Sequence, residues 1–133
     1  HRGIKDAKIM SNVLNKLEFQ IDHIFISIAK RTIETANIFF DITHTQIPYS
    51  YEEKIYDFTG YNVLDFIKKI NDKINTTVLF THNNSCNFLV THFYSKSIHV
   101  PTSSILVFDF NVNLWKDIKE ANSFRYYFPK DYR

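Results

Sequence analysis

The sequence contains very little cysteine and glycine, and each shortage excludes a class of site. Its 133 residues include one cysteine, Cys86, and two glycines. A single thiol cannot form an internal disulfide, and it cannot supply the paired cysteines of common structural zinc sites. Two glycines leave no room for a glycine-rich loop that cradles phosphate groups. We therefore expect no disulfide framework, no metal site and no cofactor.

Strong net charge and long apolar runs are also lacking. The formal net charge is only +2, which by itself is a weak indicator of nucleic-acid binding. No apolar run approaches the 18 or more residues of a membrane-spanning helix, so we expect no membrane partner. No signal peptide or arginine-rich presequence is visible. A chain of this length is most simply one domain.

Aromatic residues, by contrast, are plentiful. There are 13 Phe and 8 Tyr, and the chain is 44% hydrophobic and 23% charged, which is typical of a soluble globular protein. Isoleucine and asparagine are also abundant. Phe, Tyr, Ile and Asn are encoded by AT-rich codons, so the composition fits an organellar, viral or otherwise AT-rich genome.

The first half of the chain alternates strand and helix patterns. Apolar and polar residues alternate strictly over 16–21, which predicts a half-buried strand. Asp22 is a good N-cap, and apolar residues then recur at three- and four-residue steps, which predicts a helix over 23–39. The β-branched residues over 42–47 predict a second strand, and Pro48 predicts a bend after it.

The second half is read mainly as strands. We predict an extended piece over 54–58, a helix over 62–75 and a strand over 76–81, followed by a turn over 82–87. Strand-like runs cover 88–94, 97–100 and 105–110, a closing helix covers 114–121, and a last strand covers 124–128. We divide the chain into an N-terminal extension over 1–13 and a single α+β domain over 14–133, with a divergent insertion around 60–104.

Candidate catalytic groups are scattered. No two of the six histidines have the spacing of a helical metal motif. Cys86 could pair with His82 or His92 as a nucleophile, but no surrounding signature supports this, and Cys86 lies in an Asn/Ser-rich stretch where a lone thiol is more often inert. The neighbouring carboxylates Glu52 and Glu53 are most simply solvated turn charges. These residues do not predict an enzyme.

Basic residues interleaved with polar ones offer a second interpretation. Three lysines cluster over 68–73, and a region rich in His, Asn, Ser and Thr follows. Such residues can contact phosphates and stack on bases. An ordinary solvated helix face with its adjoining loop explains the same pattern equally well.

A resemblance to a known family comes from the residues between Asp22 and Tyr56. The sequences "DH" at 22–23, "TIETA" at 32–36 and "IPYSYEEKIY" at 47–56 occur in an order and spacing that resemble the small-subunit ribosomal protein ten (NusE) family, most closely its mitochondrial members. The chain departs from the family pattern by lacking its Ser-Pro-His step, and Ser50 replaces the second proline of the family's Ile-Pro-Leu-Pro.

The resemblance implies a ferredoxin-like α+β sandwich (β-α-β-β-α-β) with an extended β-hairpin and terminal extensions. It also implies a non-enzymatic structural component of the small subunit of a mitochondrial ribosome, located in the matrix, that binds ribosomal RNA and neighbouring ribosomal proteins and no small-molecule substrate. The alternatives are a non-catalytic protein-binding subunit of another organellar or viral assembly, and a small enzyme using His82, Cys86 or His92. The expected RNA contacts are Lys30, Arg31, His44, Lys54, Lys68, Lys69, Lys73, His82, His92 and Lys96.

Overall fold

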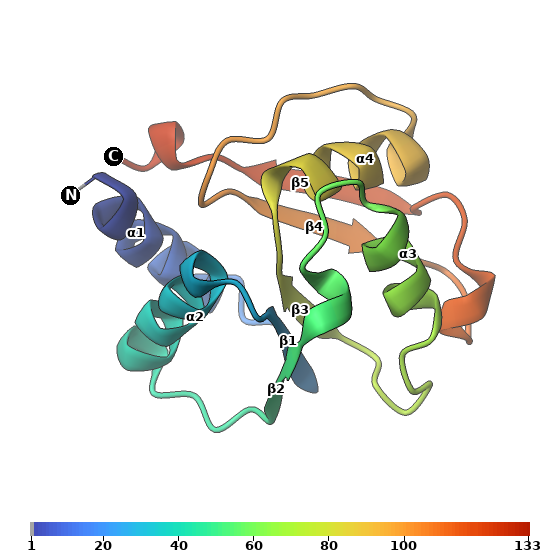
Figure 1. Cartoon of the computed structure of the whole chain (residues 1–133), viewed down its shortest axis with the longest axis horizontal. Helices are drawn as coiled ribbons and strands as arrows, with labels where there is room; N and C mark the ends of the chain where they lie inside the picture. The colour runs from blue at the N-terminus through green and yellow to red at the C-terminus, as the bar shows by residue number, and fades with distance from the viewer. Residues whose placement is uncertain (1) are drawn as a thin grey trace.

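The computed structural model describes residues 2–133, and most of its strands are separated by helices (Figure 1). The chain also contains three short 3-10 turns: η1 (Glu53–Ile55), η2 (Trp115–Asp117) and η3 (Pro129–Asp131). The main elements are α1 (Arg2–Lys16), β1 (His23–Ser27), α2 (Lys30–Thr43), β2 (Tyr49–Glu52), α3 (Tyr61–Lys68), β3 (Thr77–Phe80), α4 (Asn83–Tyr94), β4 (Ile105–Asp109) and β5 (Ser123–Tyr127).

The strands form two separate sheets. The first has the order β2-β1-β3, and β1 is parallel to both neighbours, with Phe25 opposite Ser50 on one side and Leu79 on the other. The second is an antiparallel pair, β4 and β5, in which Val107 lies opposite Arg125. A parallel sheet needs helical crossovers, and here α2 connects β1 to β2 while α3 lies between β2 and β3 in the chain.

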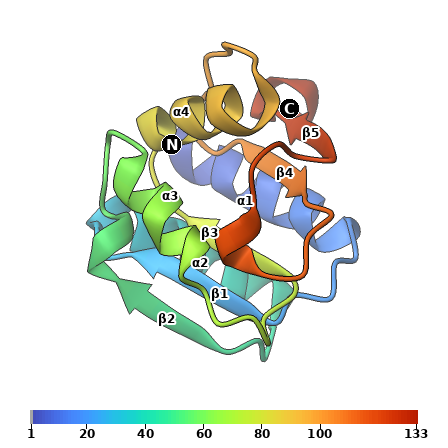
Figure 2. The same cartoon turned by 90° about the vertical axis from the view of Figure 1, so that its right-hand side faces the viewer.

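Helices cover both faces of the parallel sheet, with α1 and α2 on one side and α3 and α4 on the other (Figures 1 and 2). Side chains of β1 alternate between the two layers. Ile24 and Ile26 pack with Leu14 of α1 and Phe39 of α2, whereas Phe25 packs in the opposite layer. This burial on both faces explains why the three central residues of β1, Ile24 to Ile26, are all apolar.

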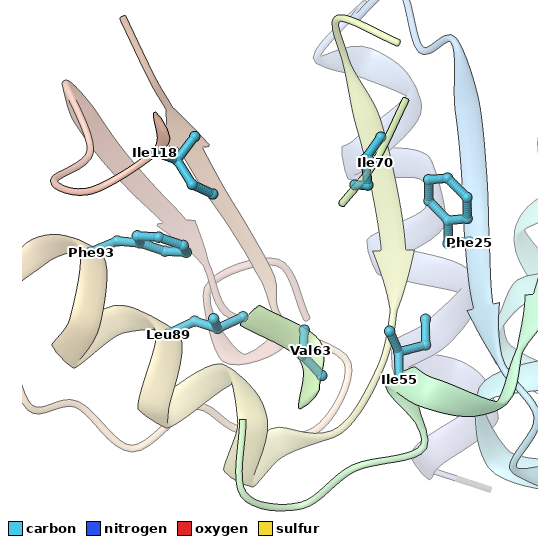
Figure 3. Packing of buried hydrophobic residues seen from close by; sticks show 7 residues of the cluster. All are labelled: Phe25, Ile55, Val63, Ile70, Leu89, Phe93 and Ile118. Carbon is cyan, nitrogen blue, oxygen red and sulfur yellow. The ribbon is translucent and has the colours of Figure 1, made fainter. Parts of the chain in front are cut away.

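The opposite layer is built from segments far apart in the sequence. Figure 3 shows Phe25 pointing toward Ile70, and Leu89 and Phe93 extending from α4. Val63 and Ile118 belong to the same cluster. This layer links the parallel sheet to the antiparallel pair through α3 and α4.

Several turns require a left-handed backbone, which the scarcity of glycine makes costly. Gly60 has φ +94° before α3, and an added Cβ there would lie 2.7 Å from the Cβ of Phe88. The other positive-φ positions in residues 2–133 are not glycine: Glu18, His44, Ser95 and Ser103. His44 and Ser95 follow the last turns of α2 and α4, where glycine is normally favoured.

The predicted strand over 16–21 and the helix start at residue 23 are wrong. Lys16 ends α1, and His23–Ser27 is strand β1. The helix begins only at Lys30. The strand was missed because a strand buried on both faces has a continuous apolar run, which periodicity cannot distinguish from a helix segment.

Further element predictions are also wrong, among them the strand over 97–100, which is a loop. Residues 88–94, predicted as a strand, belong to helix α4, and the predicted turn over 82–87 contains its first residues. The predicted strand over 42–47 is the end of α2 followed by a loop. The closing helix is reduced to η2. In contrast, β3, β4 and β5 lie within one residue of the predicted strands over 76–81, 105–110 and 124–128.

The predicted ferredoxin-like α+β sandwich is also wrong, because the larger sheet is parallel, with helices on both faces. Residues 2–16 form helix α1, which packs on α2. The division of the chain into 1–13 and 14–133, with an insertion around 60–104, stays a prediction. No helix within residues 2–133 is both long and apolar enough to cross a membrane.

Candidate functional site

The carboxyl edge of the parallel sheet brings two loops together. β1 continues through Ile28 and Ala29 into α2, and β3 continues through Thr81 and His82 into α4. Because β1 and β3 are neighbours and parallel, these loops lie side by side. Ligands of open α/β sheets bind outside the carboxyl ends of the strands, so this edge is the candidate site.

His82 is the central titratable group of this edge. Its Nε2 lies 2.9 Å from Oγ of Ser27, and its ring lies against Phe58 and Tyr56, with centroids 4.6 and 5.3 Å away. Burial lowers the pKa of His82 below its ordinary value, and the positive charge of Arg31 lowers it further, whereas Asp57 acts in the opposite direction. Burial and the charge of Arg31 thus favour the neutral form of the imidazole.

Ser27 holds the imidazole of His82 in place. Ser27 is 0% exposed, and it does not line the cavity that His82 borders. The backbone here is fixed by Thr32, whose Oγ1 donates to the carbonyls of Ser27 and Ala29, each at 2.8 Å. A hydroxyl without access to the cavity cannot attack a ligand there, so Ser27 is a positioning residue for His82.

Arg31 provides the positive charge of the site. It lies in the first turn of α2 and borders the same cavity as His82, a space of about 680 Å³ that Asn83 and Thr102 also line. Lys30, its neighbour in sequence, does not line the cavity, and its Nζ lies 4.0 Å from Oε1 of Glu34. The N-termini of α2 and α4 both begin at this edge, which adds the positive ends of two helix dipoles.

Asp57 anchors the next segment along this edge. Its carboxylate accepts hydrogen bonds from the backbone of Thr59, Gly60 and Val63 at 3.0, 2.9 and 3.1 Å. Burial alone would raise the pKa of Asp57, but these hydrogen bonds outweigh it, so its pKa is lowered. Ser85 of α4 donates to the carbonyl of Asp57. These contacts join the start of α3 to the start of α4.

Cys86 is unsuited to nucleophilic chemistry. Burial raises the pKa of its thiol to about 12, so almost none of it is thiolate at neutral pH. Its backbone N–H donates to the carbonyl of His82, inside the first turn of α4. This argues against the Cys86–His82 nucleophile pair. Within residues 2–133, no three His, Cys, Asp or Glu side chains are placed to hold a metal ion.

The structure brings some of the predicted contact residues together. Arg31 and His82 line one cavity. Lys54 and Lys69 both form ion pairs with Asp65, the second at 3.0 Å. The remaining six are distributed over other elements: Lys30 in α2, His44 at its end, Lys68 in α3, Lys73 beyond it, His92 in α4 and Lys96 beyond it.

Ser27 and Asp57 were missed at the sequence level. Ser27 could have been found from its place at the end of an apolar run, "HIFIS", because the last residue of a buried parallel strand lies at the carboxyl edge, where ligands bind. Asp57 precedes "FTG", and an aspartate shortly before a glycine is a turn and cap signal. Both signals depend on recognising the parallel sheet first.

Comparison with known proteins identifies the fold. No protein-family model and no curated protein matches the chain. Solved structures do match: the protein histidine phosphatase SixA complexed with tungstate has a TM-score of 0.76 and 14% identity, over 99% of this chain and 84% of that one. A SixA protein from Agrobacterium tumefaciens assigned as a phosphohistidine phosphatase has a TM-score of 0.75 and 17% identity, over 94% and 80%. A similarly assigned SixA from Nakamurella multipartitia has a TM-score of 0.69 and 15% identity, over 92% and 80%.

These likenesses overturn the resemblance to the ribosomal protein ten family, because the fold is the α/β fold of SixA-type histidine phosphatases. The predictions that depended on that resemblance are wrong: a structural ribosomal or other non-catalytic subunit, no enzymatic activity, ribosomal RNA and ribosomal proteins as partners, and no small-molecule substrate. The short motifs were misleading because "TIETA" lies inside an ordinary amphipathic helix, α2. A mitochondrial location stays a prediction.

Proposed function

We propose that this protein hydrolyses phosphohistidine and that the carboxyl edge of β1 and β3 binds the phosphoryl group. One observation carries the proposal: Arg31 and His82 converge on one cavity at this edge, in a fold shared with a histidine phosphatase solved with tungstate. Tungstate is a tetrahedral oxyanion with the shape and charge of phosphate, so that fold accommodates such an anion in at least one protein.

The charges at this edge suit a phosphoryl group. The guanidinium of Arg31 is planar and permanently charged, and its N–H groups match two phosphoryl oxygens. No carboxylate within residues 2–133 forms an ion pair with Arg31. Its charge is therefore available to a ligand, and the N-termini of α2 and α4 favour the same sign of charge.

His82 is suited to proton transfer. Ser27 contacts Nε2, so Nδ1 is the ring nitrogen left for a ligand. In the hydrolysis of phosphohistidine, the oxygen of water bonds to phosphorus, the P–N bond breaks, and the departing imidazole takes a proton. A neutral histidine beside the phosphoryl group can accept the proton of the attacking water or hydrogen-bond to a phosphoryl oxygen.

The binding step is tested with tungstate as the probe. Arg31→Gln removes the charge that lines the cavity, whereas Lys30→Gln removes the adjacent charge that does not. By isothermal titration calorimetry, we expect Arg31→Gln to weaken tungstate binding at least tenfold and Lys30→Gln to leave it within twofold. Equal losses in both variants would show non-specific attraction and contradict the proposed site.

The chemical step is tested with a peptide carrying phosphohistidine and a matched peptide carrying phosphoserine, using the full-length polypeptide. We expect phosphate release from the first peptide, and His82→Asn should lower its rate by roughly 100-fold, the lower end of the range for loss of a proton-transfer group. A rate unchanged by His82→Asn, or phosphoserine hydrolysed as fast as phosphohistidine, would contradict the assignment.

A further inference from the structure

The two sheets leave an opening between them. β3 is an edge of the parallel sheet and β4 is an edge of the antiparallel pair, and within residues 2–133 no ladder joins them. Residues of both strands line the 680 Å³ cavity along their whole length, from Thr77 to Phe80 and from Ile105 to Asp109. We call this opening between the edges of β3 and β4 the slot.

The residues beside the slot are unlike those of an exposed sheet edge. Every residue of β3 is partly exposed, and so are the first four of β4, whereas β1 is buried in its last four positions. Both β3 and β4 are nevertheless apolar on both faces. β3 contains Val78, Leu79 and Phe80 in succession, and β4 contains the run Ile105–Phe108. Natural edges are normally protected by charges, proline or bulges, and these edges carry none of them along that run.

Helices α1 and α4 border the slot on its two faces. Met10 and Leu14 of α1 line it from one helical layer, and Leu89 and Phe93 of α4 line it from the other. The cavity therefore lies in the sheet layer, between two helical layers. An apolar small molecule would leave the backbone N–H and C=O groups of both edges unpaired, but a β-strand would pair them.

We propose that the slot holds a further β-strand, parallel to β3, supplied by a segment of the same polypeptide that precedes α1 in its full-length form. The strand would join β3 to β4 and make one continuous sheet in the order β2-β1-β3-new strand-β4-β5. Because helices cover it on both faces, its residues should be apolar in succession, without proline.

The position of α1 favours this source. The β1–α2–β2 connection crosses the sheet in one direction with α2 on one face. A connection from the slot through α1 to β1 crosses in the same direction, and the right-handed rule then places α1 on the same face as α2. The structure has α1 there, packed on α2.

The length of α1 fits as well. Its end precedes β1 by a short loop, so it lies near the amino edge of the sheet. Its 15 residues extend about 22 Å at 1.5 Å per residue, which returns its start toward the carboxyl edge, where a strand parallel to β3 would end. The matching SixA chains also contain residues with no counterpart in this chain.

Such a strand would also extend the candidate site, and this part rests on the proposed phosphatase function. The cavity that it would enter is bordered at one end by Arg31 and His82, so the residues after the strand would lie beside both. We therefore expect the full-length protein to hydrolyse phosphohistidine much faster than residues 1–133 alone, whereas the strand itself is tested without any activity measurement.

The test compares residues 1–133 with the longest natural reading frame that contains them, by hydrogen exchange and mass spectrometry. We expect amide exchange over 77–80 and 105–109 to be at least tenfold slower in the longer protein. The strand β2 provides the control, because its outer edge does not face the slot and its exchange should be unchanged. Unchanged exchange beside the slot, or a reading frame without residues before His1, overturns the proposal.

Two further measurements identify the source of the strand. A synthetic peptide with the sequence of the preceding apolar segment, added to residues 1–133, should slow exchange over 77–80 and 105–109, and a scrambled peptide should not. If protection in residues 1–133 instead rises with protein concentration alone, a second copy fills the slot and the proposed source is wrong. These outcomes are independent of tungstate binding, so failure of the strand and failure of the phosphatase proposal are distinguishable.

Discussion

The strands β1 and β4 are similarly apolar but differ in their surroundings. β1 is paired on both edges and covered on both faces, and Ile24 and Ile26 are 0% exposed. β4 is paired only with β5, and Ile105 and Val107 remain partly exposed. The two strands have a similar apolar composition but differ in burial. Composition therefore indicates which environment suits a strand, whereas burial depends on how many strands and helices lie against it.

The largest expected effect tests this comparison directly, with the same substitution in each strand. Ile26→Ala should lower the free energy of unfolding by about 3 kcal/mol, because it removes buried atoms and leaves a cavity in a closed layer. Ile105→Ala should cost less than half as much in residues 1–133, because that side chain already borders the slot. Urea denaturation of both variants measures the two losses, and equal losses would break the comparison.

The close approach between Gly60, before α3, and Phe88 of α4 should have the next largest effect. In Gly60→Ala, the added methyl group meets Phe88 of α4 in a left-handed turn, and we expect a loss of about 2 kcal/mol from strain and displacement. Gly3 is the matched control, because no atom lies within 4 Å of an added Cβ there. Since Gly3 lies within α1, Gly3→Ala should stabilise the protein by about 0.5–1 kcal/mol.

If Gly60→Ala instead leaves the midpoint of thermal unfolding unchanged, Phe88 can move aside and the left-handed turn tolerates alanine, which contradicts the prediction. The double variant Gly60→Ala, Phe88→Ala, measured against Phe88→Ala alone, removes the contact with the ring of Phe88 but keeps the contact with the Cβ of residue 88. It should recover the part of the loss that comes from the ring and retain the part that comes from the Cβ contact and the left-handed backbone.

A smaller effect is expected where Asp57 holds the start of α3. Asp57→Asn keeps the shape of the side chain, but its amide nitrogen cannot accept the hydrogen bonds that a carboxylate oxygen accepts. We expect a loss of about 1 kcal/mol, the lower end of the cost of leaving a buried donor unpaired. The pKa of the Asp57 carboxyl is lowered in the folded protein, so its stabilisation is present above the ordinary pKa of about 3.9 and is lost as the pH falls through the folded value.

Thermal unfolding between about pH 2 and 6 checks this prediction, because the folded pKa of Asp57 lies below the ordinary value. The stability of the wild-type chain should fall more steeply with acid than that of Asp57→Asn. Parallel curves for the two proteins would show that Asp57 does not titrate differently in the folded and unfolded states.

The smallest effect concerns the electrostatics of the candidate site. Arg31→Gln should raise the pKa of His82, because the positive charge of Arg31 contributes to its lowering, although burial, the larger cause, remains. Lys30→Gln should change it less. Proton NMR of the imidazole resonances as a function of pH gives both values, and an unchanged pKa in Arg31→Gln would place Arg31 too far away to share a ligand with His82.

Sequence patterns predicted the elements that are half-buried and missed those that are buried on both faces. Most of α2 was predicted, because Ile33 and Ala36 repeat at helical spacing. β1 was missed because it has no alternation. α4 was missed because Asn83 and Asn84 read as a turn and its β-branched residues read as a strand, while its burial against the core decides its structure.

Arg31 and His82 were both singled out from the sequence, but for contacts with RNA. Each has the chemistry of a phosphate contact, and RNA and phosphohistidine share that group, so residue type alone could not separate the two. What the sequence could not show is that β1 and β3 are parallel neighbours, which brings the two residues to one cavity. Long-range strand pairing is the information that periodicity does not contain.

The left-handed turns connect stability with nucleotide composition. Glycine codons are rich in G and C, and this chain of AT-rich composition has two glycines and places Glu18, His44, Ser95 and Ser103 in conformations that glycine adopts freely. Each such residue costs about 1 kcal/mol relative to an unstrained backbone. These four turns are therefore positions where glycine should raise the midpoint of thermal unfolding without altering the core.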